Sequence, residues 1–264
     1  MLKAVLHVHS TYSDGEFTVP ELRQIFAAQG CSVICITDHA DSFDELKLAD
    51  YIRECAELSD DKFIFVCGLE YTCEQGMHLL GYGCTSLTPA KDPQKVIRHI
   101  EENHALAVIA HPKDAMFPLI DSFDVLPSGI ETWNTKYDGR YAPRPATFDL
   151  LLRLKNRRPD MKAFYGQDLH WKKQFRGLFL QLNCDSLDRD TILHTLSAGG
   201  YSGMKDHLLL PSSGELSRAL AGRFAALQAK SARTRNLIKA GKRAIDNLGI
   251  KVPASIKAQI RRIF

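Results

Sequence analysis

The sequence lacks any apolar run of membrane-spanning length, so we expect no transmembrane segment. Its N-terminus also lacks the pattern of a secretory signal peptide. The seven cysteines form no Cys-x-x-Cys pair, and most of them lie inside apolar runs. Such cysteines are typical of buried free thiols in a reducing compartment. We therefore expect a cytoplasmic protein and assign no cysteine to chemistry.

A glycine-rich phosphate-binding sequence is also missing after the first predicted strand, which argues against a doubly wound sheet. The 264 residues are 45% hydrophobic and 25% charged, as in a globular protein with a full-sized core. Apolar runs alternate with amphipathic segments, and this alternation predicts a parallel sheet covered by helices. The exception is 77–82, which follows the previous strand too closely for a crossover helix and predicts a β-hairpin. We expect an α/β fold: a closed or distorted barrel of about seven strands.

The charge of the chain is distributed unevenly along its length. Residues 205–264 contain 13 Lys/Arg and three Asp/Glu, whereas residues 1–204 contain 21 Lys/Arg and 28 Asp/Glu. The pattern of 215–247 predicts a helix, and 254–264 predicts a second, shorter one. We therefore expect a barrel domain over 1–204 and a basic helical C-terminal extension over 205–264.

The basic extension has three interpretations. It would dock on the acidic barrel through an apolar face formed by Leu227, Leu237, Ile238 and Ile245. It would alternatively contact an anionic membrane surface or a nucleic acid. Aromatic residues for base stacking are scarce in this region, so the docked form is favoured.

A His-x-His pair closes the first predicted strand, Leu2–Val8. Residues two apart on a strand point to the same side, so His7 and His9 would present their imidazoles together. Asp14 can fold back over the strand end through a Ser-Asp-Gly turn. Two imidazoles on one face are half of a metal site, although the pair alone is a weak signal.

Histidine and acidic residues recur at the C-terminal ends of other predicted strands. Besides His7 and His9, these are Asp38, His39, Glu70, His111, Asp168 and His170. The C-terminal ends of parallel barrel strands meet on one face, where barrel enzymes place their active sites. Several buried charges on one rim are costly without a cation, so this distribution favours a metal site over packing.

Six short motifs along residues 1–204 resemble those of the PHP (polymerase and histidinol phosphatase) family, in the same order. They are HVHSTYSDG at 7–15, ITDH at 36–39, GLE at 68–70, MHLLGY at 77–82, AHP at 110–112 and GQDLH at 166–170. The resemblance implies a distorted (β/α)7 TIM-like barrel that binds three divalent metal ions. Gln167 and Leu169 are bulkier than the small residues that usually flank this aspartate, and Ala40 stands where an acid is common.

The resemblance also implies a role for individual residues. His7, His9, Glu70 and Asp168 would hold one metal, Asp14, His39 and His170 a second, and Glu70, His78 and His111 a third. Asp38 and Glu131 would be auxiliary catalytic groups that orient the ligating imidazoles. Imidazole and carboxylate ligands without thiolate suit zinc, manganese or iron.

The expected activity is that of a metal-dependent phosphoesterase. A metal-bound hydroxide would attack the phosphorus of a small phosphomonoester. A phosphodiesterase or exonuclease acting on oligonucleotides is the first alternative, and a non-catalytic metal-binding module is the second. The amidohydrolases, which also begin with His-x-His, fit less well because they lack the Thr-Asp-His and Ala-His-Pro motifs.

Arginine and lysine residues on rim loops are candidates for substrate phosphate binding, because they bind phosphate oxygens well. The candidates are Lys136, Arg140, Arg144 and Arg176. Each of them could equally be a solvated loop charge.

Overall fold

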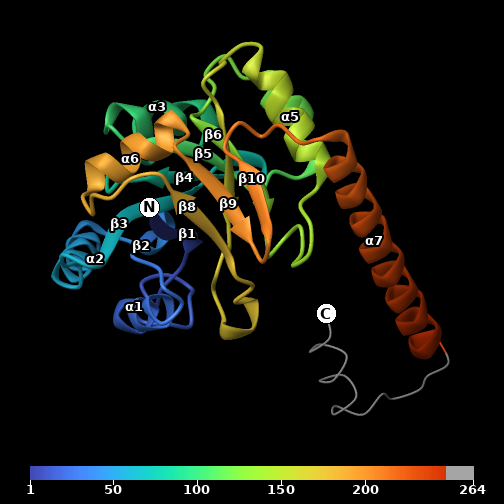
Figure 1. Cartoon of the computed structure of the whole chain (residues 1–264), viewed down its shortest axis with the longest axis horizontal. Helices are drawn as coiled ribbons and strands as arrows, with labels where there is room; N and C mark the ends of the chain where they lie inside the picture. The colour runs from blue at the N-terminus through green and yellow to red at the C-terminus, as the bar shows by residue number, and fades with distance from the viewer. Residues whose placement is uncertain (248–264) are drawn as a thin grey trace.

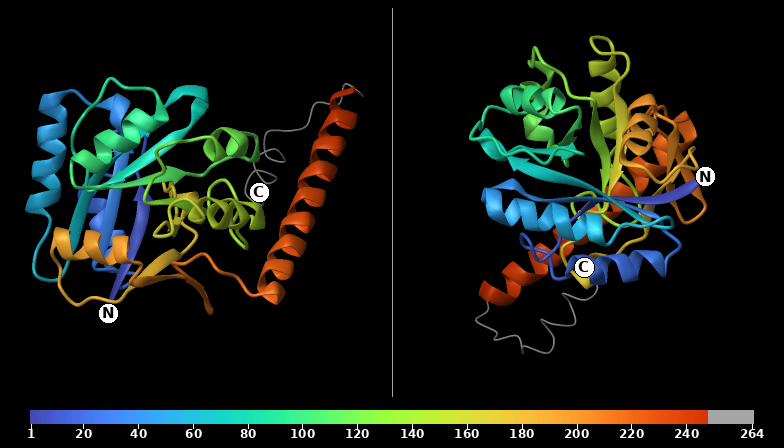
Figure 2. Two further views of the ribbon diagram at one scale, coloured as in Figure 1. Left: turned by 90° about the horizontal axis from the view of Figure 1, so that it is seen from above. Right: turned by 90° about the vertical axis from the view of Figure 1, so that its left-hand side faces the viewer.

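The computed structural model describes residues 1–247 and has a mixed α/β fold. Ten strands form one sheet in the order β10-β9-β8-β1-β2-β3-β4-β5-β6-β7. The sheet curls into a nearly closed barrel, and the helices lie around its outside (Figures 1 and 2). The TIM-like α/β barrel expected from the sequence is therefore confirmed.

The strands of the sheet are short and their directions are mixed. They are β1 (Leu2–Val8), β2 (Val33–His39), β3 (Ile64–Thr72), β4 (His78–Tyr82), β5 (Leu106–Ala110), β6 (Gly129–Asn134), β7 (Lys162–Gly166), β8 (Leu178–Leu182), β9 (Tyr201–Lys205) and β10 (Leu208–Pro211). The pairs β1–β2, β2–β3, β5–β6 and β6–β7 are parallel, and the other neighbours are antiparallel.

One expectation about this sheet is confirmed, and two features of the sheet differ from what the sequence predicted. The hairpin expected at 77–82 is confirmed, because β4 pairs antiparallel with β3. The expectation of a parallel sheet is wrong for β8, which pairs antiparallel with the start of β1. The β9–β10 hairpin was not expected, and it continues the sheet to Pro211, past the boundary expected at residue 204.

The helices begin mostly at residues that can cap them. They are α1 (Val19–Ala27), α2 (Glu45–Glu57), α3 (Pro93–Glu102), α4 (Phe117–Asp121), α5 (Pro145–Lys155), α6 (Arg189–Ala198) and α7 (Arg218–Asn247). Thr18 and Glu21 form a capping box at α1. Aspartate side chains accept backbone N–H groups at the starts of α2, α3 and α6. These caps fix where each helix starts, and therefore how long each loop on the rim is.

The segment after β7 closes the barrel against the end of β1. Gln167 N donates to Leu6 O at 3.1 Å, and Leu169 N donates to His7 O at 3.2 Å. His9 N in turn donates to Leu169 O at 3.0 Å. Because β8 pairs only with the first half of β1, the second half is free to take this segment. The motif that carries Asp168 is thereby held beside the His-x-His pair.

Helix α7 packs on the barrel through its first turns. Phe224 is 1% exposed and its ring centroid lies 6.4 Å from that of Trp133. Leu227 also packs against the core, but Leu237 is 72% exposed, so the prediction that Leu237 contributes to docking is wrong. Further along, the helix extends away from the barrel (Figure 1). The side chain of Ile245 and the helix expected at 254–264 lie outside the described residues.

Within residues 1–247, no helix has both the length and the apolar character needed to cross a membrane.

Candidate metal centre

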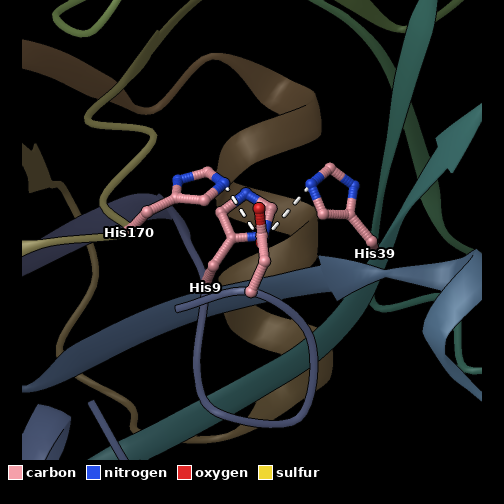
Figure 3. A group of neighbouring side chains, drawn as sticks. His9, His39 and His170 are labelled. Atoms are coloured by element: carbon pink, nitrogen blue, oxygen red, sulfur yellow. Dashed lines mark ion pairs between the residues drawn. The ribbon is translucent and has the colours of Figure 1, made fainter. Parts of the chain in front are cut away.

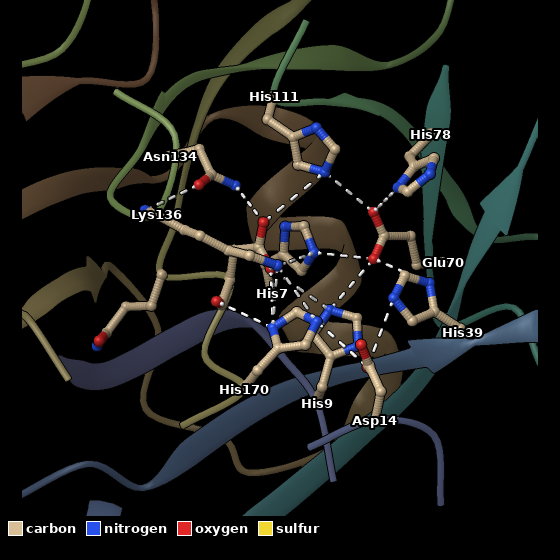
Figure 4. A network of polar contacts seen from close by, with 12 residues as sticks. His7, His9, Asp14, His39, Glu70, His78, His111, Asn134, Lys136 and His170 are labelled. Carbon is tan, nitrogen blue, oxygen red and sulfur yellow. Dashed lines mark hydrogen bonds and ion pairs between the residues drawn. The ribbon is translucent and has the colours of Figure 1, made fainter. Parts of the chain in front are cut away.

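Nine side chains meet at the rim of the barrel, where β1, β2, β5 and β7 end and β4 begins (Figure 4). They form four overlapping groups, and within each group the candidate ligand atoms lie within 4.8 Å of one another. The nine residues are His7, His9, Asp14, His39, Glu70, His78, His111, Asp168 and His170. The structure therefore brings together all the residues that the sequence predicted as ligands, and their coordination of metal stays a prediction.

Glu70 is buried and lies close to five of the six histidines of the cluster (Figure 4). Its Oε1 is 2.7 Å from His78 Nδ1 and 3.1 Å from His111 Nε2. Its Oε2 is 3.2 Å from Nε2 of both His7 and His9. One carboxylate thus faces histidines on two sides, an arrangement that can bridge two cations.

Asp14 and three histidines form one group of the cluster; Figure 3 labels the histidines and Figure 4 labels Asp14. Asp14 Oδ1 lies 3.2 Å from His170 Nε2 and 3.6 Å from His39 Nε2. The third imidazole, His9, is fully buried, and its Nε2 lies 3.2 Å from Glu70 Oε2, but neither ring nitrogen makes a well-aligned hydrogen bond among the described residues. A buried imidazole without such hydrogen bonds is costly, and coordination of a metal ion would satisfy one of its nitrogens.

Three of the nine residues have backbone angles that non-glycine residues rarely adopt. The φ angles are +58° at His7, +30° at His111 and +53° at Asp168. His7 also lies at a register shift of β1 against β2, so His7 and His9 do not share a face through regular strand alternation as expected. Strain of this kind concentrates at functional sites, where the surrounding structure imposes it.

Neighbouring charges set the protonation of the cluster. Burial lowers the pKa of His7, but Glu131, Asp168 and Glu70 outweigh burial and raise the pKa of His7 well above 6.5. Burial lowers the pKa of His9 to about 3, and Glu70 offsets this only in part. Burial raises the pKa of Glu70, but His7 and other histidines bring it well below its ordinary value. His9 is therefore neutral near pH 7, the form in which imidazole binds metal.

Glu131 on β6 orients His7 from behind the cluster. Its Oε1 is 2.8 Å from His7 Nδ1, and its Oε2 accepts from the backbone N–H of His111 at 2.9 Å. A carboxylate at Nδ1 holds the proton there and leaves Nε2 free to bind a cation. Residue 166 packs directly against Glu131, and a Cβ at Gly166 would clash with Oε1.

Asp38 on β2 holds the loop that carries Asp14. Its carboxylate accepts from Ser10 N at 2.8 Å, Ser10 Oγ at 2.7 Å and Ser13 Oγ at 2.5 Å. Burial raises the pKa of Asp38, and the Ser13 and Ser10 contacts oppose that shift. The structure therefore places Asp38 under the loop, with its oxygens directed to the two serines.

Of the four predicted phosphate contacts, Lys136 lies in the cluster itself. Its Nζ is 3.0 Å from Asp168 Oδ1 and 3.3 Å from both ring nitrogens of His170. Arg140 is exposed on the same loop. Arg144 contacts Asp138, Asp114 and Pro112 O instead of facing the cluster.

The guanidinium of the remaining candidate, Arg176, is directed to a backbone carbonyl, Thr135 O. Burial and the nearby Arg140 lower the pKa of Arg176.

Asn134 was missed by the sequence-based prediction. Its Nδ2 donates to Glu131 Oε2 at 2.9 Å and to Asp168 Oδ2 at 3.2 Å, and its Oδ1 accepts from Lys136 N at 3.0 Å. The position of Asn134 at the end of β6, three residues after Glu131, is the signal that could have found it. Tyr137 was also missed, and its ring lies 4.3 Å from that of His111.

A cavity of about 380 Å³ is lined by Ala40 and Tyr71, which directly follow His39 and Glu70 in the sequence, but by none of the nine candidate ligands. Phe43, Tyr71, Leu87 and Pro89 give it apolar walls. Asp41 and Lys91 also line it, and they form an ion pair at 2.7 Å. The cavity therefore offers one apolar side and one polar side to a small organic group.

The donor atoms of the cluster fit divalent metal ions. Six imidazoles and three carboxylates meet at distances close to those of metal ligands that share an ion, and Glu131 orients one of them as supporting carboxylates do at metal sites. This donor set, which contains no thiolate, suits zinc, manganese or iron.

Comparison with known proteins identifies the family of this chain. A search with family models matches residues 6–167 to the PHP domain. A search of curated proteins finds no match.

Among solved structures, the chain is similar to a two-domain protein from Bacteroides vulgatus that contains a predicted PHP-like metal-dependent phosphoesterase. The identity is 17% and the TM-score 0.54, and the match covers 79% of this chain and 66% of that protein. The chain thus spans just under two thirds of the length of that two-domain protein. It is also similar to PsfC from Pseudomonas syringae, with 11% identity and a TM-score of 0.52, over 88% of this chain and 98% of that one. At these identities the likeness supports the barrel fold. Because the family match covers more than half of the sequence, the chain belongs to the PHP domain family.

Proposed function

We propose that this protein is a metal-dependent hydrolase of phosphate esters and that its substrate is a small phosphomonoester. The observation that carries the proposal is the convergence of nine candidate ligand side chains in one cluster that contains Glu70, with a buried His9 whose ring nitrogens make no well-aligned hydrogen bond among the described residues. All nine positions hold side chains that can bind metal, which argues against a non-catalytic module.

We assign the nine residues to three ions. The first set is His7, His9, Glu70 and Asp168, the second is Asp14, His39 and His170, and the third is Glu70, His78 and His111. Bound divalent ions would supply a hydroxide nucleophile near neutral pH and offset the charge on the phosphoryl oxygens. Glu131 keeps the His7 proton on Nδ1, so that Nε2 can act as a ligand.

Lys136 is the protein cation best situated to bind the substrate phosphate. Its ammonium now neutralises Asp168 at 3.0 Å. A metal ion held by Asp168 would compete for the same oxygen, and Lys136 would then turn toward a phosphate oxygen within reach of its flexible stem. The group that protonates the leaving oxygen is left unassigned.

The cavity beside His39 supports a small substrate. Its volume of about 380 Å³ is near the lower end of the range of about 300–1,000 Å³ for small-molecule sites. The organic part of the ester would lie against Phe43 and Leu87 while the phosphate faces the histidines.

A phosphodiesterase acting on oligonucleotides is the second candidate, and exposed aromatic side chains favour it. Tyr141 is 73% exposed and Trp171 is 42% exposed, and each has a cation beside it, Arg140 at 5.8 Å and Lys173 at 5.5 Å from the ring centroid. Such pairs can stack bases and contact phosphates.

One experiment separates these proposals. The purified protein is analysed for bound metal, loaded with zinc, manganese or iron, and assayed on p-nitrophenyl phosphate, bis(p-nitrophenyl) phosphate and a short oligonucleotide. We expect hydrolysis of the monoester and its loss in His9→Ala. Faster hydrolysis of the diester or the oligonucleotide would favour the second candidate. Metal binding without turnover of any ester, or unchanged activity in His9→Ala, would refute the proposed function.

A further inference from the structure

Helix α7 contacts the loop that leads from β6 to α5, and the polar part of this contact comes from Gln228. Gln228 Nε2 donates to Asp138 O at 2.8 Å and to Ala142 O at 2.6 Å. The two carbonyls lie on either side of the exposed tip of the loop, which contains Arg140. Phe224, one turn earlier on α7, is buried against Trp133 at the base of the same loop. The helix thus contacts the loop at its base and near its tip.

The part of the loop that Gln228 contacts is connected to the candidate metal centre by hydrogen bonds. Asp138 Oδ2 accepts from Asn134 N at 2.9 Å, and Asp138 N donates to Asn134 O at 2.8 Å. Asn134 then contacts Asp168 and supports the backbone N–H of Lys136. Each step of this path is a direct contact, so a shift of the loop at Asp138 moves the group next to Asp168.

The surroundings of the loop explain why hydrogen bonds from α7 are needed to hold it in place. Tyr137, Arg140 and Tyr141 are exposed, so the apolar burial of the loop tip is limited to Ala142 and Pro143. Arg144 anchors its far end through Asp138. The remaining hydrogen bonds to the loop tip come from Trp133 Nε1, which donates to Gly139 O at 3.0 Å, and from Gln228. A loop with few buried contacts opens readily unless such hydrogen bonds hold it.

We infer that helix α7 is a positioning element of the active site, and that Gln228 holds the 134–144 loop in the conformation that places Lys136 beside Asp168 and His170. This inference rests on the proposed function, because it gives Lys136 a role in binding phosphate. Gln228 touches neither the candidate ligands nor the place of the substrate, so it acts only through the loop. The C-terminal helix is thereby part of the site, although the family match ends at residue 167.

The test compares Gln228→Glu with Asn236→Asp in the full-length, metal-loaded protein. Both changes replace an amide with a carboxylate on α7, but Asn236 is exposed beyond the docked turns. The glutamate keeps the size of Gln228, removes the N–H donor and brings a negative charge to two carbonyl oxygens. Gln228→Lys restores a donor and is the rescue variant. The readouts are kcat and KM for p-nitrophenyl phosphate, the Kd of inorganic phosphate by calorimetry, and hydrogen exchange of the 134–144 segment by mass spectrometry.

For Gln228→Glu we expect KM and the phosphate Kd to rise by about 10- to 100-fold, the scale of a misplacement of about 1 Å near a reacting group. Exchange of the loop should quicken while exchange of β1 stays as in the wild type. Asn236→Asp should match the wild type, and Gln228→Lys should recover part of the loss.

Three results would overturn the inference. The first is unchanged loop exchange and KM in Gln228→Glu, and the second is faster exchange with unchanged KM and phosphate binding. The third is a lower unfolding midpoint with neither effect, which would make Gln228 a purely structural contact. If the wild type hydrolyses no ester, the proposed function fails separately, and loop exchange with phosphate binding then decides the inference.

Discussion

Replacing Glu131 with glutamine tests how the buried carboxylate behind His7 prepares the metal centre. Three donors point at this carboxylate: His7 Nδ1, the backbone N–H of His111 and Asn134 Nδ2. A carboxylate accepts from all three, whereas glutamine offers one acceptor oxygen and one donor group. The side chain keeps its volume, so the change isolates charge and hydrogen bonding from packing.

Neither orientation of the new amide satisfies the site. If its NH2 faces His7, the imidazole must accept at Nδ1, and its proton moves to Nε2, the atom that faces Glu70. If its NH2 faces Asn134, donors meet donors in a buried site, which costs about 1–3 kcal/mol. Loss of a carboxylate that supports a metal ligand typically weakens metal binding by about 10- to 100-fold, or about 1.4–2.7 kcal/mol. We therefore expect a loss of metal affinity in that range.

The assay is calorimetric titration of the metal-free protein with zinc and manganese, with Glu102→Gln as the control. Glu102 is exposed on α3, so the same chemical change there should leave affinity unchanged. In the metal-free variant the pKa of His7, measured by NMR, should fall, because one of the carboxylates that raise it has lost its charge. A metal affinity within about twofold of the wild type would refute the argument that the charge of Glu131 prepares His7.

Three further predictions follow from the same structure. Gly166→Ala should weaken metal binding in the same calorimetric assay, because its Cβ would displace the Glu131 carboxylate; unchanged affinity would mean that the carboxylate has room to move. Hydrogen bonds from Ser186 and Thr191 lower the pKa of Asp188 to about 2, so its contribution to stability is present above the unfolded value of about 3.9 and is lost as pH falls toward 2. The difference in denaturant midpoint between wild type and Asp188→Asn should therefore close over that window, and a constant difference would contradict it. Removing metal with a chelator should lower the thermal midpoint, and metal at about 100 times its Kd should add about 2.7 kcal/mol to the free energy of unfolding; identical midpoints with and without metal would argue against a site in the native state.

The candidate ligands could be predicted because each lies in a short motif at a strand end. His39 and Glu70 follow apolar runs whose burial the sequence pattern indicates directly. Asn134 could not be identified in this way, because a single amide after a strand is common and only its contact with Asp168 makes it part of the site. Gln228 was still harder to identify from the sequence, because it lies 90 positions from Asp138 and no local pattern connects the two residues.

The parts of the fold that were missed depend on pairing between distant segments. The antiparallel pairing of β8 with β1 brings together two segments that are far apart in the sequence, and periodicity within either strand carries no information about direction. The turn between β9 and β10 contains Asp206 and His207 in place of the Asn-Gly or Asp-Gly that marks a tight hairpin. The register shift at His7 arises where β1 passes β2, so strand alternation alone predicted the wrong geometry for two residues that do lie in the cluster.

The hydrogen bonds between the segment after β7 and the end of β1 have a consequence for how the protein matures. Gln167 and Leu6 are 161 positions apart, and closing so long a loop is an entropic cost that local contacts cannot offset early in folding. During synthesis the His-x-His pair emerges first. Asp168 is added only after all the strands from β1 to β7 have been made. The complete set of candidate metal ligands therefore comes together only in chains whose barrel has closed, so metal binding at this cluster would select finished molecules over partly folded ones.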